Sequence, residues 1–261
     1  MVSVNKGTAP SHNAIYRNEE NIYRLAEGED VIEVPLYWED GNGVNVRKVL
    51  TFKRDSYIID IHNYVTAGEQ QWSGSDYMQI TRSRPVDTNA NAFIRTYTGG
   101  VVYNDEIKYE KYDFDDIAEK NLDYQLSDGW LAMIQHYFLA AWIPERGKDN
   151  LYYSRYNRNK DHYTLGARTS AITIEPGQTG EINSRLVVGP KLQYELEEIA
   201  PVLDLTVDYG ILTIFAKPLF WLLNAFHEIF NNWVWAIIFL TITVKAVFFK
   251  LSEMSYRSMA R

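Results

Sequence analysis

The sequence WVWAIIFLTITVKAVFF, residues 233–249, is an almost unbroken apolar run near the end of this 261-residue chain. With flanking residues it reaches the roughly 20 residues that a helix needs to cross a hydrocarbon core. Trp233 and Trp235 stand at its start, where indole rings favour the headgroup level of a bilayer. Because the run is long and lacks an amphipathic stripe, it predicts a transmembrane helix over residues 232–250 rather than the buried helix of a soluble protein.

Basic residues after the run predict its orientation. Lys250, Arg257 and Arg261 follow it and are opposed by Glu253. Since Lys and Arg accumulate on the cytoplasmic side of membrane proteins, the C-terminus is predicted in the cytoplasm and the preceding domain outside it. Export of such a domain requires an N-terminal signal. The polar stretch after Met1 shows none, so we expect a signal upstream or already removed.

Lys245 interrupts the apolar run with a positive charge. A cation inside a membrane helix is costly unless it reaches water, a partner or the interface. Spacing leaves two interpretations open. The ammonium snorkels towards the interface marked by Lys250, about one and a half turns away, or it lines a wet cavity inside the membrane. Thr241, four residues earlier, shares its helical face.

The preceding sequence KPLFWLLNAFHEIFN, residues 217–231, has one apolar face at helical spacing. Pro218 suits the first turn of such a helix, where its missing N–H is not needed. Because the segment directly precedes the apolar run, we predict an amphipathic helix over residues 208–231 that lies in the membrane interface, rather than an ordinary surface helix. The expected membrane-interface residues are Pro218, Leu219, Trp221, Leu222, Phe226, Trp233 and Trp235.

Charge and cysteine content exclude several classes of function. The chain has a net charge of −8, and residues 1–200 alone carry −9 without a basic stripe, which argues against nucleic acid as a partner. There are no cysteines, so disulfides, zinc-thiolate sites and a cysteine nucleophile are excluded. A cysteine-free acidic domain is compatible with a bacterial periplasm.

Short β-like segments separated by turns fill residues 31–207, after a polar segment, residues 1–30, predicted as a linker or loosely attached. They predict a large antiparallel β-sandwich. Gly41-Asn42-Gly43 predicts a hairpin turn, Gly99-Gly100 and Pro176-Gly177 predict further turns, and 191–199 predicts a helix. The run from Trp130 to Trp142 is so apolar that periodicity does not distinguish a helix from a buried strand pair. The predicted strands are 31–38, 44–52, 57–65, 77–81, 93–98, 101–103, 108–114, 152–156, 162–167, 171–174 and 180–188.

Catalytic patterns are scarce, so we predict no enzyme, no cofactor and no metal site. The histidines His12, His62, His136 and His162 lack metal-binding spacing, and no Gly-rich phosphate loop or GxSxG motif occurs. The acidic cluster Asp113, Asp115 and Asp116 has the residue type for acid–base work, but such a run is more often a solvated loop. The nineteen tyrosines are suited to a carbohydrate groove, but more often they cover half-buried sheet faces.

Longer stretches resemble the membrane protein insertase family YidC of Gram-negative bacteria. The resemblance rests on LDLTVDYGILTIFAKPLFWLLNAFHEIFNNW at 203–233 and on LSEMSYRSMAR at 251–261. Upstream, EKYDFDDIAEKNLDYQLSDGWLAMIQHYFLAAWIP at 110–144 and GQTGEINSRLVVGPKLQYELEEIAP at 177–201 resemble the large periplasmic domain of that family. The similarity covers residues from about 32 to 261.

This resemblance implies an architecture. Residues 31–207 would form a mutarotase-like antiparallel β-supersandwich in the periplasm, with the 130–142 run as strand. Residues 208–231 would be the periplasmic-side amphipathic helix. Residues 232–250 would be the second transmembrane helix of the full protein, and residues 251–261 would begin a cytoplasmic helical segment. Lys250 stands where the family often has proline, so the helix is expected to continue further than usual.

The resemblance also implies a function. The family carries a cation in a hydrophilic intramembrane groove that helps transmembrane segments enter the inner-membrane bilayer, with or without the Sec translocon. Lys245 matches that position, although the family more often has arginine there, and Thr241 matches a groove-lining position. The implied partners are nascent membrane proteins and the lipid bilayer. The Sec translocon and the ribosome would associate through parts of the family that lie mostly outside residues 1–261.

Two rival functions remain. The first is a membrane-anchored periplasmic binding module for a protein partner or a carbohydrate. The second is an epimerase-like enzyme, which the mutarotase likeness suggests. Against the enzyme, the sequence shows no convincing catalytic His/Glu set.

Overall fold

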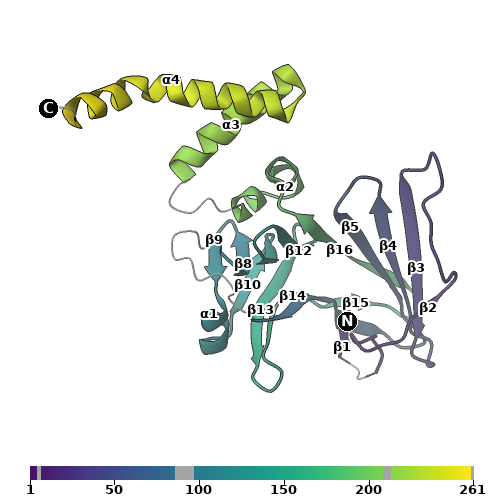
Figure 1. The fold of residues 1–261 in the computed structure, drawn as a ribbon. Coiled ribbons are helices and arrows are strands. Elements are labelled where there is room, and N and C mark those ends of the chain that lie inside the picture. The colour runs from purple at the N-terminus through teal and green to yellow at the C-terminus, as the bar shows by residue number, and fades with distance from the viewer. Residues whose placement is uncertain (5–6, 86–96, 208–212, 260–261) are drawn as a thin grey trace. The chain divides into compact units, whose positions relative to one another are not determined.

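The computed structural model describes residues 1–4, 7–85, 97–207 and 213–259 (Figure 1). They fall into a β-rich unit that ends at Val207, called the sandwich below, and a helical unit from residue 213 onward, called the helical hairpin. The predicted fold class is confirmed, because the chain is mainly β with antiparallel sheets followed by helices. The expected strand 93–98 lies for the most part outside the described residues.

A nine-stranded antiparallel sheet organises the sandwich, in the order β2-β3-β4-β5-β16-β12-β11-β8-β9. Its pairings join distant parts of the sequence, as when β5 pairs with β16. Its strands are β2 (Arg17–Asn18), β3 (Val31–Glu39), β4 (Asn45–Lys53), β5 (Ile58–Thr66), β8 (Gly99–Asn104), β9 (Lys108–Tyr112), β11 (Trp130–Ile134), β12 (Phe138–Pro144) and β16 (Thr179–Pro190).

Two smaller sheets, four α-helices and one 3-10 helix complete the described parts of the chain. The first sheet contains β1 (Val2–Ser3), β6 (Trp72–Ser75) and β15 (Ile172–Ile174). The second contains β10 (Asp123–Ser127), β13 (Asp149–Asn157), β14 (His162–Thr169) and β7 (Tyr77–Ser83). The α-helices are α1 (Phe114–Glu119), α2 (Gln193–Ile199), α3 (Thr213–Phe230) and α4 (Trp233–Met259), and η1 (Leu203–Thr206) is a 3-10 helix.

The central strands β8 and β11 are buried on both faces. Leu131 and Met133 of β11 pack towards the four-stranded sheet and α1, whereas Trp130, Ala132 and Ile134 pack under α2 and η1. A strand covered on both sides needs apolar residues at every position, so its sequence loses the alternation that marks a half-buried strand. This is why the run from Trp130 to Trp142 was ambiguous in sequence. It forms the strand pair β11–β12, not a helix.

Two expectations for the sandwich were wrong. Gly99 and Gly100 do not turn the chain but begin β8, where they pair with Ile134 and Met133. A Cβ on Gly99 would lie 2.9 Å from the Tyr112 carbonyl oxygen and 2.5 Å from the Tyr97 hydroxyl oxygen, so close packing favours glycine at this position.

The acidic cluster is also not a solvated loop. The Asp113 side chain accepts hydrogen bonds from the backbone N–H groups of Asp115 and Asp116, and the Asp116 carboxylate accepts one from the N–H of Asp113. This capping box starts α1 and satisfies N–H groups that the first turn of a helix leaves without partners. The predicted strand 108–114 therefore ends at Tyr112.

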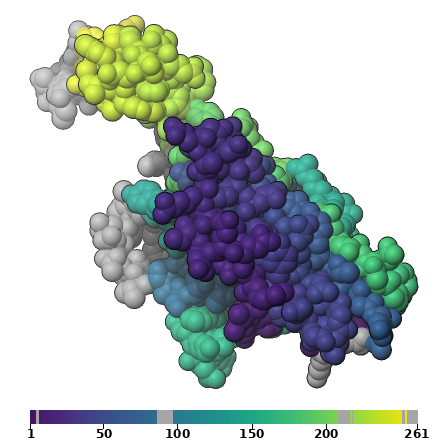
Figure 2. Space-filling view, turned by 90° about the vertical axis from the view of Figure 1, so that its right-hand side faces the viewer, coloured from purple at the N-terminus to yellow at the C-terminus, as the bar shows by residue number. Residues whose placement is uncertain are grey.

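The N-terminal segment contributes short strands to two sheets. Val2 and Ser3 of β1 pair with β6, and Arg17 and Asn18 of β2 pair with β3. Met1 is buried in a cluster with Val46 and Trp72. In Figure 2 the purple N-terminal part of the chain covers the face turned towards the viewer. Residues 1–30, predicted as a linker, thus contain these two anchored parts among stretches without helix or strand.

Candidate functional site: the helical hairpin and a hollow in the sandwich

Two asparagines reverse the chain between α3 and α4. Asn231 adopts a left-handed backbone conformation, with φ of +46°, and its N–H donates to the His227 carbonyl oxygen at 2.7 Å. Asn232 caps the next helix, because its side-chain oxygen accepts the N–H of Val234 at 2.8 Å. Asparagine suits both tasks, since it tolerates the left-handed region and its short amide reaches nearby backbone groups.

Aromatic rings hold the two helices of the hairpin together. Phe239 of α4 stacks on Phe230 of α3, with ring centroids 4.6 Å apart, and His227 stacks on Trp233 at 3.8 Å. Ala236, which lies between Trp233 and Phe239 in the sequence, is fully buried. Its small side chain allows the two helices to approach closely. These contacts lie at the turn end of the hairpin.

The sequence predicted Pro218 in the first turn of the helix, but in the structure it lies further inside α3. The helix already begins at Thr213, which makes Pro218 its sixth residue. Proline lacks the N–H that would bond to the carbonyl four residues earlier, so α3 contains one site without its regular hydrogen bond. The helix nevertheless continues from Thr213 to Phe230.

The predicted membrane-interface residues divide by exposure. Five are exposed: Pro218, Leu219, Trp221, Trp233 and Trp235. Leu222 and Phe226 are half-buried, and the Phe226 ring lies 6.1 Å from that of Phe239. Trp221 is 68% exposed, although it is one of the largest apolar side chains of α3. The hairpin thus presents aromatic and aliphatic groups at its surface, as membrane-contacting helices do.

Helix α4 is long and apolar enough to cross a membrane between Trp233 and Lys250, judged by length and composition. It continues without a break to Met259. Its 27 residues give a rise of about 40 Å, more than a hydrocarbon core of about 30 Å needs. The helix thus continues beyond Lys250, and the expectation that it runs further than is usual in the family stays a prediction.

Lys245 and Thr241 share one face of α4, one helical turn apart. Both side chains are exposed. The Thr241 hydroxyl donates to the Ile237 carbonyl oxygen at 2.8 Å, and Thr243 bonds to Phe239 in the same way. These hydroxyls are satisfied within the helix. Within the described part of residues 213–259 the Lys245 ammonium forms no ion pair or hydrogen bond. It is therefore an unpaired charge on a helix that is long enough to span a bilayer.

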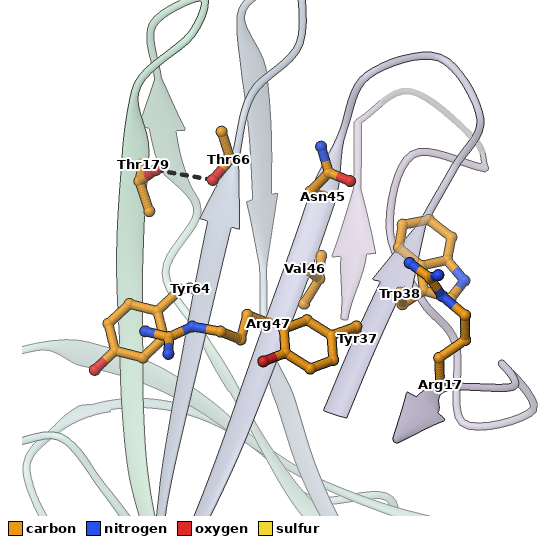
Figure 3. A pocket seen from close by; sticks show the side chains of 9 residues that line it. All are labelled: Arg17, Tyr37, Trp38, Asn45, Val46, Arg47, Tyr64, Thr66 and Thr179. Atoms are coloured by element: carbon orange, nitrogen blue, oxygen red, sulfur yellow. Dashed lines mark hydrogen bonds between the residues drawn. The ribbon is translucent and has the colours of Figure 1, made fainter. Parts of the chain in front are cut away.

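A hollow of about 340 Å³ lies on the nine-stranded sheet (Figure 3). The strand register places Arg17, Tyr37, Arg47, Tyr64 and Glu181 side by side on five neighbouring strands. All but Glu181 line the hollow. The complete lining is Arg17, Tyr37, Trp38, Asn45, Val46, Arg47, Tyr64, Thr66 and Thr179.

Most polar groups in and around the hollow already have partners. The Arg47 guanidinium lies 4.5 Å over the Tyr64 ring, as Figure 3 shows, and Arg17 pairs with Glu39 at 3.6 Å. The Tyr37 hydroxyl donates to Glu19 at 2.6 Å, and this hydrogen bond raises the pKa of Tyr37. Stacking leaves the edge of the Arg47 guanidinium available, which suits a carboxylate or another polar group.

One contact near the hollow was missed in the sequence. His62 Nδ1 lies 3.1 Å from a carboxylate oxygen of Glu181, although 119 residues separate them. Both side chains are exposed to solvent, and neither lines the hollow. Among the described residues, no three His, Asp or Glu side chains gather as a metal site would require. The row formed by Arg17, Tyr37, Arg47 and Tyr64 was also missed in the sequence. Like the His62–Glu181 pair, it exists only because the strands from β2 to β16 pair in this register.

The fold and the hairpin define a class of protein: an antiparallel β-sandwich joined to a helix of membrane-spanning length. The family model of the YidC periplasmic domain matches residues 1–222. The chain therefore belongs to the YidC family.

Its relatives carry the name membrane protein insertase YidC. That of Methylococcus capsulatus is 47% identical over 96% of this chain and 46% of its own length. That of Nitrosococcus oceani is 46% identical over 98% of this chain and 47% of its own length. The chain thus spans about half the length of the curated relatives it matches.

Solved structures with a related arrangement of strands are distant in sequence. A galactose mutarotase related enzyme from Lactobacillus acidophilus shares 9% identity and covers 68% of this chain and 72% of its own, with a TM-score of 0.44. A variant GH36 alpha-galactosidase from Geobacillus stearothermophilus shares 8% identity over 73% of this chain and 31% of its own, with a TM-score of 0.49. Likeness at this level says nothing about activity.

Proposed function

We propose that this chain is the periplasmic domain, interfacial helix and one spanning helix of a membrane protein insertase. The observation that carries the proposal is the unpaired Lys245 on α4, a helix of membrane-spanning length in a chain of the YidC family. Relatives that carry the insertase name support it. In the proposal, α3 lies in the interface, and Pro218, Leu219, Trp221, Leu222, Phe226, Trp233 and Trp235 contact lipid headgroups.

The proposed mechanism is physical and makes no covalent bond. Lys245 and Thr241 line a hydrophilic groove, which is completed by helices of the longer protein. Water in that groove shortens the hydrocarbon barrier for the polar segment of a substrate. The ammonium attracts acidic residues near the segment that must cross, and the apolar segment then moves sideways into lipid. The substrates are nascent membrane proteins, delivered with or without the Sec translocon and the ribosome.

The proposed location is the bacterial inner membrane. The sandwich, with its excess of acidic residues, lies in the periplasm, and the residues after Lys250 lie in the cytoplasm. The tryptophans before the apolar run and the basic residues after it support this orientation.

The decisive test changes Lys245 in the full-length parent protein and measures insertion of a substrate with an acidic extracellular tail. Lys245→Arg keeps the charge and is expected to insert normally. Lys245→Ala and Lys245→Glu are expected to slow insertion several-fold. Lys250→Ala is the matched control, since Lys250 lies on the same helix beyond the apolar run. Equal insertion by all variants would leave only the snorkelling explanation for Lys245.

Residues 1–261 alone are expected to lack insertase activity. A single spanning helix cannot enclose a groove, so reconstitution of this chain in liposomes should not raise insertion of a small single-span substrate above that of empty liposomes. Activity of the isolated chain would contradict the groove mechanism.

The hollow on the nine-stranded sheet favours a second candidate function, a periplasmic binding module for a carbohydrate or a protein partner. It offers guanidinium and tyrosine groups at one place. Deleting most of the sandwich from the full-length parent separates the two functions. Retained insertion assigns the activity to the membrane part, and lost insertion assigns a necessary role to the sandwich. A sugar mutarotation assay is expected to give no turnover, because the exposed His62–Glu181 pair lies outside the hollow.

A further inference from the structure

One end of the sandwich carries a group of exposed apolar side chains. Tyr137, Phe138 and Tyr194 are 68%, 55% and 58% exposed, values far above those of a protein core. Single exposed apolar residues are common, but a gathered group marks an interaction surface. We call this group the aromatic edge; it consists of Tyr57, Tyr137, Phe138, Val188, Leu192 and Tyr194.

Backbone contacts show that these residues belong to one place. Phe138 at the start of β12 pairs with Pro190 at the end of β16, and the N–H of Lys191 donates to the Tyr137 carbonyl oxygen at 2.9 Å. The N–H of Val188 donates to the carbonyl of Tyr57 at 3.0 Å. Leu192 and Tyr194 follow directly at the start of α2. The group thus comes from three elements, β12, β16 and α2, and from Tyr57 just before β5, and it gathers at one end of the nine-stranded sheet.

The Tyr57 ring is fixed by its packing on a glycine. A Cβ on Gly189 would lie 2.6 Å from a ring atom of Tyr57, so only glycine leaves room for the ring in this position. The ring therefore covers the backbone of β16 at Gly189, on the face of the strand opposite to the Val188 side chain. A tyrosine held in this way loses little further freedom when its outer edge meets a partner.

The aromatic edge lies next to the point where the chain leaves the sandwich. Lys191 donates from Nζ to the carbonyl oxygen of Thr206 at 3.2 Å, and Thr206 precedes the last residue of the sandwich. From Val207 to Thr213, the first residue of α3, the chain spans at most about 20 Å. If α3 lies in the membrane interface, as the proposed function requires, the edge is held within reach of lipid headgroups.

We propose that the aromatic edge rests in the headgroup layer of a phospholipid bilayer and sets the sandwich against the membrane; this rests on the proposed function for the hairpin. Tyrosine suits that layer, because its ring is apolar and its hydroxyl reaches water. Exposed carboxylates of Glu195, Glu197 and Glu198 on α2 lie nearby in sequence. These negative charges are compatible with a bilayer of zwitterionic lipids, whereas a strongly anionic bilayer would repel them.

The absence of cysteine from the chain gives a direct test. A single cysteine in the full chain, Tyr194→Cys, is labelled with an environment-sensitive fluorophore and reconstituted in phosphatidylcholine vesicles that contain lipids with a headgroup nitroxide. We expect strong quenching and a blue shift of emission. Gln178→Cys is the control. Gln178 is exposed and lies at the other end of β16, a strand of 12 residues that spans roughly 36 Å, and its label is expected to remain unquenched.

Changing the edge itself sharpens this test. Tyr137→Ser and Phe138→Ser, made together in the Tyr194→Cys chain, remove two exposed rings without opening a core. We expect them to lower the quenching several-fold. A Tyr194 label no more quenched than the Gln178 label would overturn the proposal, and it is the result expected if the edge binds a protein partner, since none is present.

A label on α4 separates failure of this proposal from failure of the proposed function. Ile238→Cys lies in the apolar run, and lipids with a nitroxide deep in the acyl chain should quench its label. If this label is quenched and the Tyr194 label is not, the hairpin enters the bilayer but the aromatic edge does not touch it. If neither label is quenched, the membrane placement of the hairpin has failed as well.

Discussion

The sandwich and the helical hairpin use the same apolar residues in opposite ways. The sandwich hides Trp130, Leu131 and Ile134 almost completely between its sheets and helices. In the hairpin, Trp233, Ile237 and Ile242 are each more than half exposed, and Ala236 is the one described residue that is fully buried. The sandwich supplies its own apolar surroundings, whereas the hairpin needs them from outside. The exposed apolar surface of the hairpin suits lipid, as the proposed function requires, whereas the surface of the sandwich suits water.

The largest effect is expected from a matched pair of isoleucines. Ile134→Ala removes a side chain that is 1% exposed and should lower the unfolding free energy of the sandwich by about 2–5 kcal/mol. Ile242→Ala, at a side chain 55% exposed on α4, should change it by less than about 0.5 kcal/mol. Urea unfolding of the full chain in detergent, followed at the β-sheet circular dichroism band, measures both. Equal losses would contradict the division into two solvents.

A second test concerns close packing inside the sandwich. Gly129 has φ of +95°, and a Cβ there would lie 2.2 Å from the Tyr103 carbonyl oxygen. Gly129→Ala should lower the unfolding free energy by at least about 1–3 kcal/mol, from backbone strain with the clash in addition. Gly147→Ala isolates the strain, because φ there is +75° and no atom lies within 4 Å of the new Cβ. If Gly129→Ala and Gly147→Ala lower the unfolding free energy equally, the close contact with Tyr103 does not restrict the residue at position 129.

Alkaline pH should affect the sandwich but not the hairpin. Burial raises the pKa of the phenols of Tyr97, Tyr112 and Tyr152. The unfolded chain releases these protons near pH 10, while the folded sandwich keeps them, so the stability present below pH 10 is lost as pH rises. Above pH 10, each such tyrosine lowers the unfolding free energy of the sandwich by about 1.4 kcal/mol per pH unit.

The measurement is the urea midpoint of the sandwich at pH 9, 10 and 11. Tyr152→Phe should reduce the slope with pH, although at neutral pH it also loses the hydrogen bond of the Tyr152 hydroxyl to the Asp128 carbonyl. The helicity of the hairpin serves as the internal control, since the sequence from 213 to 259 holds a single tyrosine, Tyr256, near the end of α4. An unchanged slope in Tyr152→Phe would refute the buried-phenol explanation.

The smallest effect concerns the two helix caps. Asp113→Ala removes the cap of α1 and should lower the unfolding free energy of the sandwich by about 1 kcal/mol, whereas Asp113→Asn keeps an acceptor and should lower it less. Asn232→Ala removes the cap of α4 and should leave the unfolding of the sandwich unchanged, because Asn232 belongs to the other unit. A drop in sandwich stability in Asn232→Ala would show that the units do not unfold independently.

The sequence predicted local structure where one periodic signal dominated. Alternation on both sides of Gly41-Asn42-Gly43 predicted the hairpin found as β3 and β4, and the apolar run predicted α4. Prediction from the sequence failed where two local signals point to different structures. The Asp113 cluster has the composition of a loop and the spacing of a capping box, and Pro218 marks a helix start but is tolerated inside α3.

Contacts between distant strands were beyond prediction from residues alone. The Arg17–Tyr37–Arg47 row and the His62–Glu181 pair depend on the order and register of five strands, and no local pattern encodes either. The aromatic edge was missed for a related reason, because the exposed fraction of an aromatic side chain is a property of the fold. Lys245 and Thr241 were predicted from spacing and family resemblance, and their role in a groove stays a prediction.

The most direct test asks whether α4 separates the sandwich from the C-terminus across a bilayer. A chain with two cysteines, Gln178→Cys and one added after Arg261, is reconstituted in sealed liposomes and treated with a membrane-impermeant maleimide. If α4 spans the bilayer, each molecule should carry one label whichever way it inserted, and two labels after detergent is added, as counted by intact mass. Intact liposomes that yield only molecules with two labels or none would place both sites on one side and contradict the spanning hairpin.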